Sequence, residues 1–334
     1  MTWPPRLRRA GRRTNLALFV LLLGAFLTGW VAFAVAEPVT ASVVTLAHGL
    51  LGLGVVALVP WKSVVVGRAR QVRAASLLLA VAIVACLAGG FVLVFAGYVD
   101  VLGVTPIQLH VGGALVAVPL FVLHVVRHRR RQVPRRRDLD RRALLRTAGF
   151  AAVAAAGYGA LEGLGRVTGA PSAQRIATGS HPLAPADVPS TSWLLDRVPV
   201  LDPLTHCVDI GGRPMSVAEL AALAGPVAAR LDCTSGWYAD ETWTAVRLDR
   251  VLQVSDAASI EVASVTGYSR LFPAAEATRL WLAVAREGQG LGVGRGAPVR
   301  LVVPGRRGFW WVKWVARVRL VDTPAWLQPP FPVQ

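Results

Sequence analysis

Leu231-Asp-Cys-Thr-Ser-Gly-Trp237 is the stretch that decides the fold of the C-terminal part of this chain. It predicts a strand that ends at Cys233, followed by a sharp turn that would expose the sulfur. A second stretch, Gly296-Ala-Pro-Val-Arg-Leu-Val-Val-Pro-Gly-Arg-Arg-Gly-Phe-Trp-Trp-Val-Lys-Trp314, is rich in arginine and tryptophan and suits an anionic cofactor. Because thiolate is a soft ligand, Cys233 is the strongest candidate metal ligand.

Together the two stretches resemble the sulfite-oxidase family of molybdopterin enzymes, which includes bacterial protein-methionine-sulfoxide reductases. The resemblance covers about the last 130 residues, enough for one compact domain. It implies a molybdopterin cofactor whose molybdenum is bound by Cys233. It also implies that a Gly-x-Pro-x-Arg run and a Val-Lys-Trp run help to hold the pterin.

Further site residues follow from the resemblance, position by position. Arg300 matches the pterin-contacting arginine, and Lys313 matches the lysine of Val-Lys-Trp. Tyr268 is similar to a tyrosine that serves as hydrogen-bond donor or proton relay beside molybdenum. From residue type alone, Tyr268 could equally be a cross-strand aromatic, and the two cations could be solvated.

Two departures from the family pattern bear on the substrate. Arg295 stands where the family often has histidine, which keeps a cation beside the cofactor. Trp237 and Tyr238 follow Cys233 where sulfite oxidases place an arginine that grips an oxyanion. An aromatic entrance favours a neutral or apolar substrate, such as a small-molecule or protein sulfoxide, over sulfite.

The positive charge lies almost wholly in the first half of the chain. Residues 1–164 hold 19 Lys and Arg against 5 Asp and Glu, a net of 19 − 5 = +14, whereas residues 165–334 give 17 − 14 = +3. The arginines stand between long apolar runs and lack interleaved aromatics, which argues against nucleic-acid binding and for a membrane protein. Those runs, each close to the ~20 residues of a spanning helix, are Leu16–Ala36, Ala41–Pro60, Ala74–Tyr98 and Pro106–Val126.

A fifth run, Ala143–Gly165, is built from alanine and glycine and is also predicted to span. The loops 1–15, 61–73 and 127–142 carry the arginines, which predicts a cytoplasmic N-terminus. Five spans then place the C-terminal domain outside the cytoplasmic membrane, and four would leave it inside. The predicted organisation is a basic N-terminus (1–15), a four-helix membrane domain (16–126), a basic loop (127–142), a fifth span (143–165), a Pro-rich linker (166–200) and an oxidoreductase domain (201–334).

The segment Asp140-Arg-Arg-Ala-Leu-Leu-Arg146 resembles a twin-arginine export signal, which accompanies transport of folded proteins. An ordinary basic flank of a membrane helix is the alternative interpretation. Export of a folded domain agrees with a cofactor that is inserted in the cytoplasm.

The outer domain is predicted to be β-rich α+β. Ser216-Val-Ala-Glu219 is a capping box that predicts a helix, and Thr244–Gln253 has apolar residues near helical spacing. The expected strands are Leu204–Ile210, Arg230–Cys233, Ser259–Val265, Leu280–Arg286, Pro298–Val303 and Trp310–Val321.

Two features leave alternatives open. Cys207 and Cys233 could form a disulfide, which would make the outer domain a non-catalytic binding module. His48 and His110 lie at matched depth in two spans, with Gly49, Gly52, Gly112 and Gly113 leaving room beside the rings. They could ligate one haem b, or they could be polar packing between helices. The main interpretation is a membrane-bound molybdopterin oxidoreductase with two-electron, oxo-transfer chemistry, exchanging electrons with quinone or another redox partner.

Overall fold

The structure is a computed structural model that describes residues 11–68, 74–128, 141–191, 197–254 and 256–329. The chain forms two compact units, Met1–His181 and Pro182–Gln334. The boundary lies inside the predicted linker, and each unit is described by itself.

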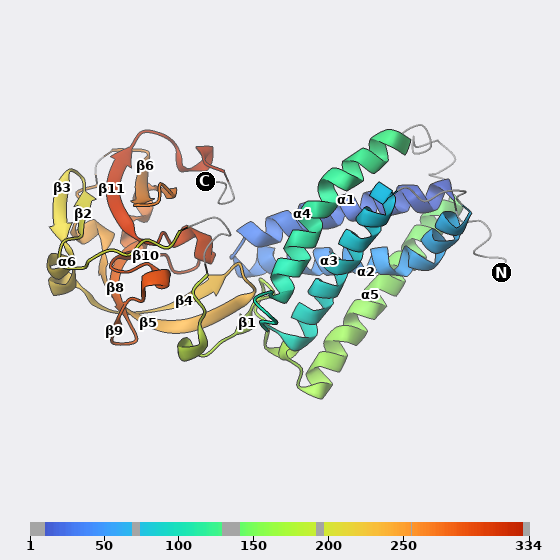
Figure 1. Ribbon diagram of the computed structural model, residues 1–334, viewed down its shortest axis with the longest axis horizontal. Coiled ribbons are helices and arrows are strands. Elements are labelled where there is room, and N and C mark those ends of the chain that lie inside the picture. The colour runs from blue at the N-terminus through green and yellow to red at the C-terminus, as the bar shows by residue number, and fades with distance from the viewer. Residues whose placement is uncertain (1–10, 69–73, 129–140, 192–196, 255, 330–334) are drawn as a thin grey trace. The chain divides into compact units, whose positions relative to one another are not determined.

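The first unit is helical (Figure 1). Its helices are α1 (Arg12–Ala34), α2 (Pro38–Gly67), α3 (Ala74–Ala96), α4 (Pro106–His128) and α5 (Arg141–Thr168), followed by the 3₁₀ turn η4 (Pro171–Gln174). Within the described residues, α1 to α4 are long and apolar enough to cross a membrane, whereas α5 is not among such helices. The four predicted apolar runs are thus confirmed as helices, and the fifth span stays a prediction.

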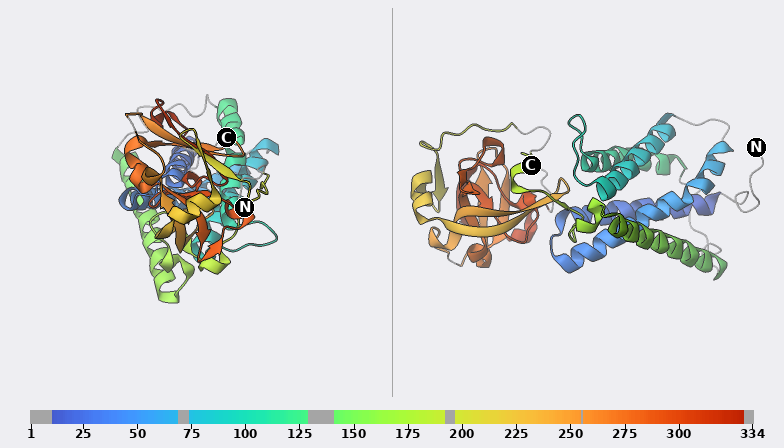
Figure 2. Two further views of the ribbon diagram at one scale, coloured as in Figure 1. Left: turned by 90° about the vertical axis from the view of Figure 1, so that its left-hand side faces the viewer. Right: turned by 90° about the horizontal axis from the view of Figure 1, so that it is seen from below.

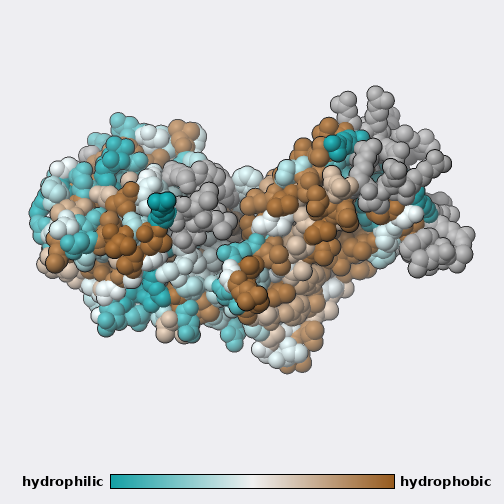
Figure 3. All heavy atoms as spheres, in the orientation of Figure 1, coloured by the Kyte–Doolittle hydropathy of each residue, from teal (hydrophilic) through white to brown (hydrophobic). Residues whose placement is uncertain are grey.

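The helices pack in two groups. α1 packs along α2, which also carries α5, while α3 packs along α4. Gly113 permits the close approach of α3 and α4, because a Cβ there would lie 2.9 Å from the backbone nitrogen of Cys86. Large apolar side chains such as Val43, Val84 and Leu115 point outward from these helices, and Figure 3 shows apolar residues over this part of the chain. Such a surface suits lipid rather than water.

Local sequence explains how α2 begins. Glu37 is the N-cap, and its carboxylate accepts hydrogen bonds from the backbone nitrogens of Val39 (3.0 Å) and Thr40 (2.7 Å). Pro38 follows at the first helical position, where its missing N–H costs nothing.

The second unit begins at Pro182, the last residue of β1 (His181–Pro182), and contains two sheets (Figure 2). In the first sheet β5 lies between β4 and β8, β10 pairs with β8, and β9 extends the edge of β8. The second sheet has the order β3-β2-β11-β6-β7, with β11 parallel to β2 and antiparallel to β6. The strands are β2 (Cys207–Ile210), β3 (Arg213–Ser216), β4 (Gly225–Cys233), β5 (Trp237–Arg247), β6 (Ser259–Ser264), β7 (Ser269–Pro273), β8 (Trp281–Arg286), β9 (Gln289–Gly290), β10 (Arg300–Val302) and β11 (Val315–Val321).

The mixed, β-rich α+β prediction is confirmed, and so is the capping box. The Ser216 hydroxyl accepts from the Glu219 nitrogen while the Glu219 carboxylate accepts from the Ser216 nitrogen, opening α6 (Val217–Leu223). The helix predicted over Thr244–Gln253 is wrong: Thr244 to Arg247 end β5, and only the 3₁₀ turn η6 (Leu248–Arg250) follows. Pairing of β5 with β4 and β8 on both edges overrides the local spacing.

Three strands are clearly shorter than predicted. In the segment predicted as Leu204–Ile210, β2 begins only at Cys207. In the segment predicted as Trp310–Val321, the 3₁₀ turn η9 (Gly308–Trp310) and the left-handed Trp314 (φ 53°) precede β11. In the segment predicted as Pro298–Val303, β10 begins only at Arg300.

Candidate functional site

Cys233 is the last residue of β4, and a tight turn joins it to β5. The two strands are in register up to the pair Cys233 and Trp237, and Gly236 supplies the positive φ (87°) that the turn requires. The thiol lies 3.6 Å from the Thr191 hydroxyl and accepts from the Ser235 nitrogen at 3.5 Å. The predicted strand end and turn are confirmed.

The predicted exposure of the sulfur is wrong, because Cys233 is only 7% exposed. η9 packs against the end of β4 so closely that a Cβ at Gly308 would lie 3.3 Å from the Cα of Cys233. A buried thiol is shielded from bulk solvent and adventitious oxidants.

Cys207 does not pair with Cys233. Both thiols are free, Cys207 is exposed at the start of β2, and the two residues lie in different sheets. The disulfide alternative is therefore wrong. Within the described residues no three His, Cys, Asp or Glu side chains gather to hold a metal ion. Cys233 is thus suited to a metal whose remaining ligands come from elsewhere.

A buried ion pair holds the backbone at Cys233. Arg307 Nη1 donates to Asp232 Oδ1 at 2.7 Å, and Arg307 Nη2 lies 3.4 Å from the Cys233 carbonyl oxygen. The two charged side chains are 5% and 9% exposed. Arg307 was not among the predicted site residues, although the doublet Arg306-Arg307 lies in the arginine-rich stretch that begins at Gly296. The sequence did contain one signal for this ion pair, namely Asp232, a potential partner for an arginine directly before Cys233.

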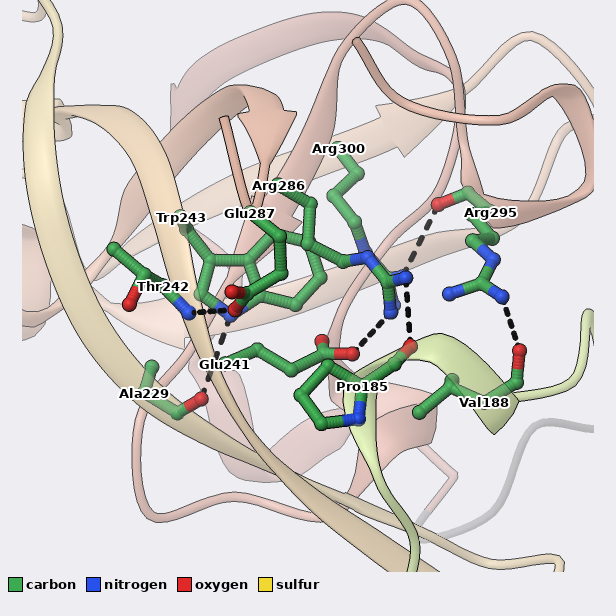
Figure 4. A network of polar contacts seen from close by, with 10 residues as sticks. All are labelled: Pro185, Val188, Ala229, Glu241, Thr242, Trp243, Arg286, Glu287, Arg295 and Arg300. Carbon is green, nitrogen blue, oxygen red and sulfur yellow. Dashed lines mark hydrogen bonds and ion pairs between the residues drawn. The ribbon is translucent and has the colours of Figure 1, made fainter. Parts of the chain in front are cut away.

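A cluster of arginines surrounds one buried carboxylate in the same domain. Figure 4 shows Glu241 of β5 among the side chains of Arg286, Arg295 and Arg300. Arg286 is ion-paired with Glu241 and donates to the Pro185 carbonyl oxygen (2.9 Å). Arg300 donates to the Arg295 carbonyl oxygen (3.1 Å), and Arg295 donates to that of Val188. Three guanidiniums around one carboxylate leave a formal surplus of two positive charges.

The surplus charge is buried beside Cys233. Arg300 is 4% exposed, and its burial lowers the pKa to about 10, with the Glu241 carboxylate and the Cys233 thiol acting in the opposite sense. Burial likewise lowers the pKa of Arg295 and raises that of Glu241. Such a cluster favours an anion that would neutralise it.

Several buried polar atoms in this region have no hydrogen-bond partner. They are Arg295 Nη1, Arg300 Nε, Trp237 Nε1 and Glu241 Oε2. Buried polar atoms are normally paired, so orphaned donors in one region indicate a polar ligand. A molybdopterin offers a phosphate for the cations and dithiolene sulfurs that complete the coordination of a metal on Cys233, so these residues fit that cofactor.

Lys313 and Trp237 are the other two predicted cofactor-binding residues. Lys313 Nζ donates to the carbonyl oxygens of Thr191 and Gly294 (2.8 Å to Gly294), so Thr191 contacts both Lys313 and the Cys233 sulfur. Gly296 (φ 104°) lets the chain pass close to Lys313, because a Cβ there would lie 3.1 Å from the lysine Cβ. The predicted aromatic entrance at Trp237 is wrong, because that side chain is 1% exposed and belongs to the core.

Tyr268 is linked to the end of β4 through η9. Its hydroxyl donates to the carbonyl oxygen of Phe309 at 2.5 Å, and Phe309 follows Gly308, which packs against Cys233. Tyr268 thus connects to the end of β4 through η9. Its role beside a metal stays a prediction.

The first unit brings His48 of α2 and His110 of α4 together. Their Nε2 atoms lie 3.4 Å apart, and the ring planes are nearly perpendicular at 87°. His48 Nδ1 lies 2.9 Å from the Ala25 carbonyl oxygen, and His110 Nδ1 lies 2.7 Å from that of Cys86. Because a carbonyl accepts only, each Nδ1 carries the proton and each Nε2 presents a lone pair to the other.

Glycines shape the surroundings of both rings, though not all those predicted. A Cβ at Gly29 would lie 2.9 Å from His48 Cε1, and one at Gly90 would lie 2.9 Å from His110 Nδ1. Gly52 and Gly112 face open space as expected. Gly49 and Gly113 leave no room beside the rings, because Tyr158 and the Cys86 backbone occupy those positions.

Comparison with known proteins bears on the second unit. Residues 196–327 match the family described as oxidoreductase molybdopterin binding domain. Among curated proteins, none matches the chain. Among solved structures, the sulfane dehydrogenase SoxCD from Paracoccus pantotrophus is similar at 22% identity and a TM-score of 0.35, over 38% of this chain and 40% of that one. The second unit, which carries the free buried cysteine and the arginine cluster, thus matches an oxidoreductase molybdopterin binding domain over residues 196–327.

Proposed function

We propose that this protein is a membrane-bound molybdopterin-dependent oxidoreductase whose molybdenum is bound by Cys233. The single observation that carries the proposal is the free, buried thiol beside a buried cluster of arginines with orphaned donors. When bound, the cofactor supplies two-electron, oxo-transfer chemistry at the metal. The protein supplies the binding site, its charge and the exclusion of water.

Each residue of the site has a part in this proposal. Arg295 and Arg300 neutralise the cofactor phosphate, because their guanidiniums belong to the surplus of positive charge left by Glu241. Lys313 fixes the chain at Thr191 and so positions the hydroxyl beside the Cys233 sulfur. Trp237 offers a buried indole N–H that has no hydrogen-bond partner. Tyr268 holds η9 through its hydrogen bond to the Phe309 carbonyl oxygen.

The substrate we propose is a neutral sulfoxide of a small molecule or a protein. No arginine follows Cys233 within the turn, and the nearby Arg307 is engaged by Asp232. In this proposal the described arginines near the sulfur are engaged by Asp232 or by the cofactor, which favours a neutral substrate over an oxyanion such as sulfite. Reduction of a sulfoxide consumes two electrons and two protons and releases the thioether and water.

We further propose that His48 and His110 are the axial ligands of one haem b. Two lone pairs facing each other across 3.4 Å repel, and an electron-pair acceptor between them would remove that repulsion. Metal–imidazole bonds are about 2.0 Å long, so an iron would need the two Nε2 atoms about 4 Å apart, a small outward shift. His48 of α2 and His110 of α4 come from the two helix groups, so the haem would lie between them.

Electrons from a membrane quinol would reach the molybdenum through this haem. The positive loops 1–15, 61–73 and 127–142 favour a cytoplasmic N-terminus, and α5 as a fifth span would place the oxidoreductase domain on the outer side of the cytoplasmic membrane. The arginine pair at the start of α5 would then act as an uncleaved export signal.

A spectroscopic experiment tests the electron route. The purified protein in detergent is reduced anaerobically with a soluble quinol while the haem b absorption is followed, and a sulfoxide is then added. We expect quinol to reduce the haem and sulfoxide to reoxidise it in the wild type. In Cys233→Ser, reduction should persist after sulfoxide addition. A haem that is reoxidised equally fast in Cys233→Ser would overturn the route through molybdenum.

A further inference from the structure

The segment after α5 contains two buried polar side chains without hydrogen-bond partners. Ser172 Oγ and both ring nitrogens of His181 are unpaired, and these residues are only 4% and 2% exposed. The carbonyls of Leu93 and Pro171 lie near the imidazole without meeting hydrogen-bond geometry. Because buried polar groups are almost always paired, two in one short segment indicate a ligand.

This segment covers the end of the bundle where α2 and α4 begin. η4 packs against both α3 and α5, so it joins the two helix groups. Thr45 Oγ1 donates to the Ala177 carbonyl oxygen at 3.0 Å, and Thr45 is about one helical turn from His48 on α2.

On α3, the ring of His181 lies against Gly97 and near the carbonyl of Leu93. Leu93 is about one turn beyond Gly90, where a Cβ would lie 2.9 Å from His110 Nδ1. The segment therefore contacts both helix groups at positions about one helical turn from His48 and His110.

The segment also contributes an arginine to a partly buried ion pair. Arg175 is ion-paired with Glu162 of α5, and its Nε donates to the Ser172 carbonyl oxygen at 3.1 Å. Burial, aided by the charge of Arg175, lowers the pKa of His181 to about 4. His181 is thus neutral at pH 7 in the absence of a ligand and offers one N–H donor. A hydroxyl and an imidazole without hydrogen-bond partners, next to the ion-paired Arg175, suit a carboxylate that would share the guanidinium with Glu162.

We propose that Ser172, Arg175 and His181 bind the propionate groups of the haem held by His48 and His110. The inference rests on the haem of the proposed function. A haem b carries both of its propionates on one edge. Since His48 and His110 lie about one helical turn from the segment, the propionates of a haem between them could reach its donors. The segment 171–181 supplies those donors, and the haem would supply the partners that Ser172 and His181 lack.

Haem esterification tests the inference without changing the protein. Protein produced in haem-deficient cells is reconstituted with haem b or with haem dimethyl ester, in which the propionates are uncharged. Transfer of each haem to excess apomyoglobin is then timed. We expect the ester to leave the wild type about tenfold faster than haem b, the loss of one charge-assisted hydrogen bond.

Variants of the segment test whether Ser172 and His181 cause this difference in haem transfer rate. In His181→Phe combined with Ser172→Ala, haem b should leave about as fast as its ester, whereas the exposed control Ser42→Ala should behave as the wild type. His181→Gln, which retains a donor, should restore part of the difference. The low-spin bis-imidazole spectrum checks that each variant still holds iron between His48 and His110.

The outcomes separate the two proposals. If the wild type binds haem b and its ester with equal lifetimes, the propionate assignment is overturned and the haem site stands. If the wild type binds neither, so that no low-spin spectrum forms, both the haem and the propionate assignment are overturned.

Discussion

Loss of Arg307 should strongly destabilise the oxidoreductase domain. Its ion pair with Asp232 is 2.7 Å long and almost fully buried, so Arg307→Met leaves a carboxylate in the domain interior without its cation. Removing one partner of a buried pair costs about 3–5 kcal/mol. Since a domain of this size has about 5–15 kcal/mol of stability, that is a large share.

The corresponding shift in melting temperature follows from the size of the unit. For about 150 residues, 1 kcal/mol changes Tm by about 2–4 °C, so Arg307→Met should melt about 6–20 °C lower than the wild type. The double variant Asp232→Asn with Arg307→Met removes both charges and should recover much of that loss, since replacing a whole buried pair is often nearly neutral.

The assay is thermal unfolding of the full protein in detergent. Limited proteolysis at each temperature, with mass spectrometry of peptides from residues 182–334, reports the melting of the oxidoreductase domain. Arg230→Met is the matched control, because its ion pair with Asp240 is exposed. We expect the control to melt within about 2 °C of the wild type. A single Arg307→Met variant that melts with the control, or a double variant as unstable as the single one, would refute the reasoning.

Two further predictions concern the membrane unit. Gly90→Leu should displace the His110 ring and abolish the low-spin haem signal, because even a Cβ there would lie 2.9 Å from His110 Nδ1. The control Gly112→Ala should retain the signal, because Gly112 faces open space. An unchanged spectrum in Gly90→Leu would contradict the proposed haem site. Replacement of Arg141 and Arg142 by lysine should strand the oxidoreductase domain in the cytoplasm, so that external protease no longer cleaves it in intact spheroplasts. Equal cleavage in the variant and the wild type would exclude an export signal at α5.

The sequence predicted those features that rest on local chemistry. Long apolar runs predicted α1 to α4, the Ser216 capping box predicted α6, and Cys233 was placed correctly at the end of a strand. Features that depend on tertiary contacts were missed. Arg307 could be matched with Asp232 only once η9 and β4 were seen to meet, and Thr244–Arg247 is a strand because two neighbours pair with it.

The burial of aromatic side chains was also beyond the sequence. Trp237 was expected at an entrance because it follows Cys233 in the chain, yet the alternation along β5 directs it inward with Trp243. The same alternation buries Glu241, whose carboxylate interacts with Arg286, Arg295 and Arg300. The resemblance had indicated Arg295 and Arg300 as separate positions and did not predict this shared carboxylate.

X-ray absorption at the molybdenum edge would show whether the Cys233 sulfur binds molybdenum. The wild type and the control Cys207→Ser, which changes an exposed free thiol, should show the same sulfur coordination. Cys233→Ser should either lose its molybdenum or retain it with one sulfur ligand fewer. Full molybdenum content with an unchanged sulfur shell in Cys233→Ser would contradict the account.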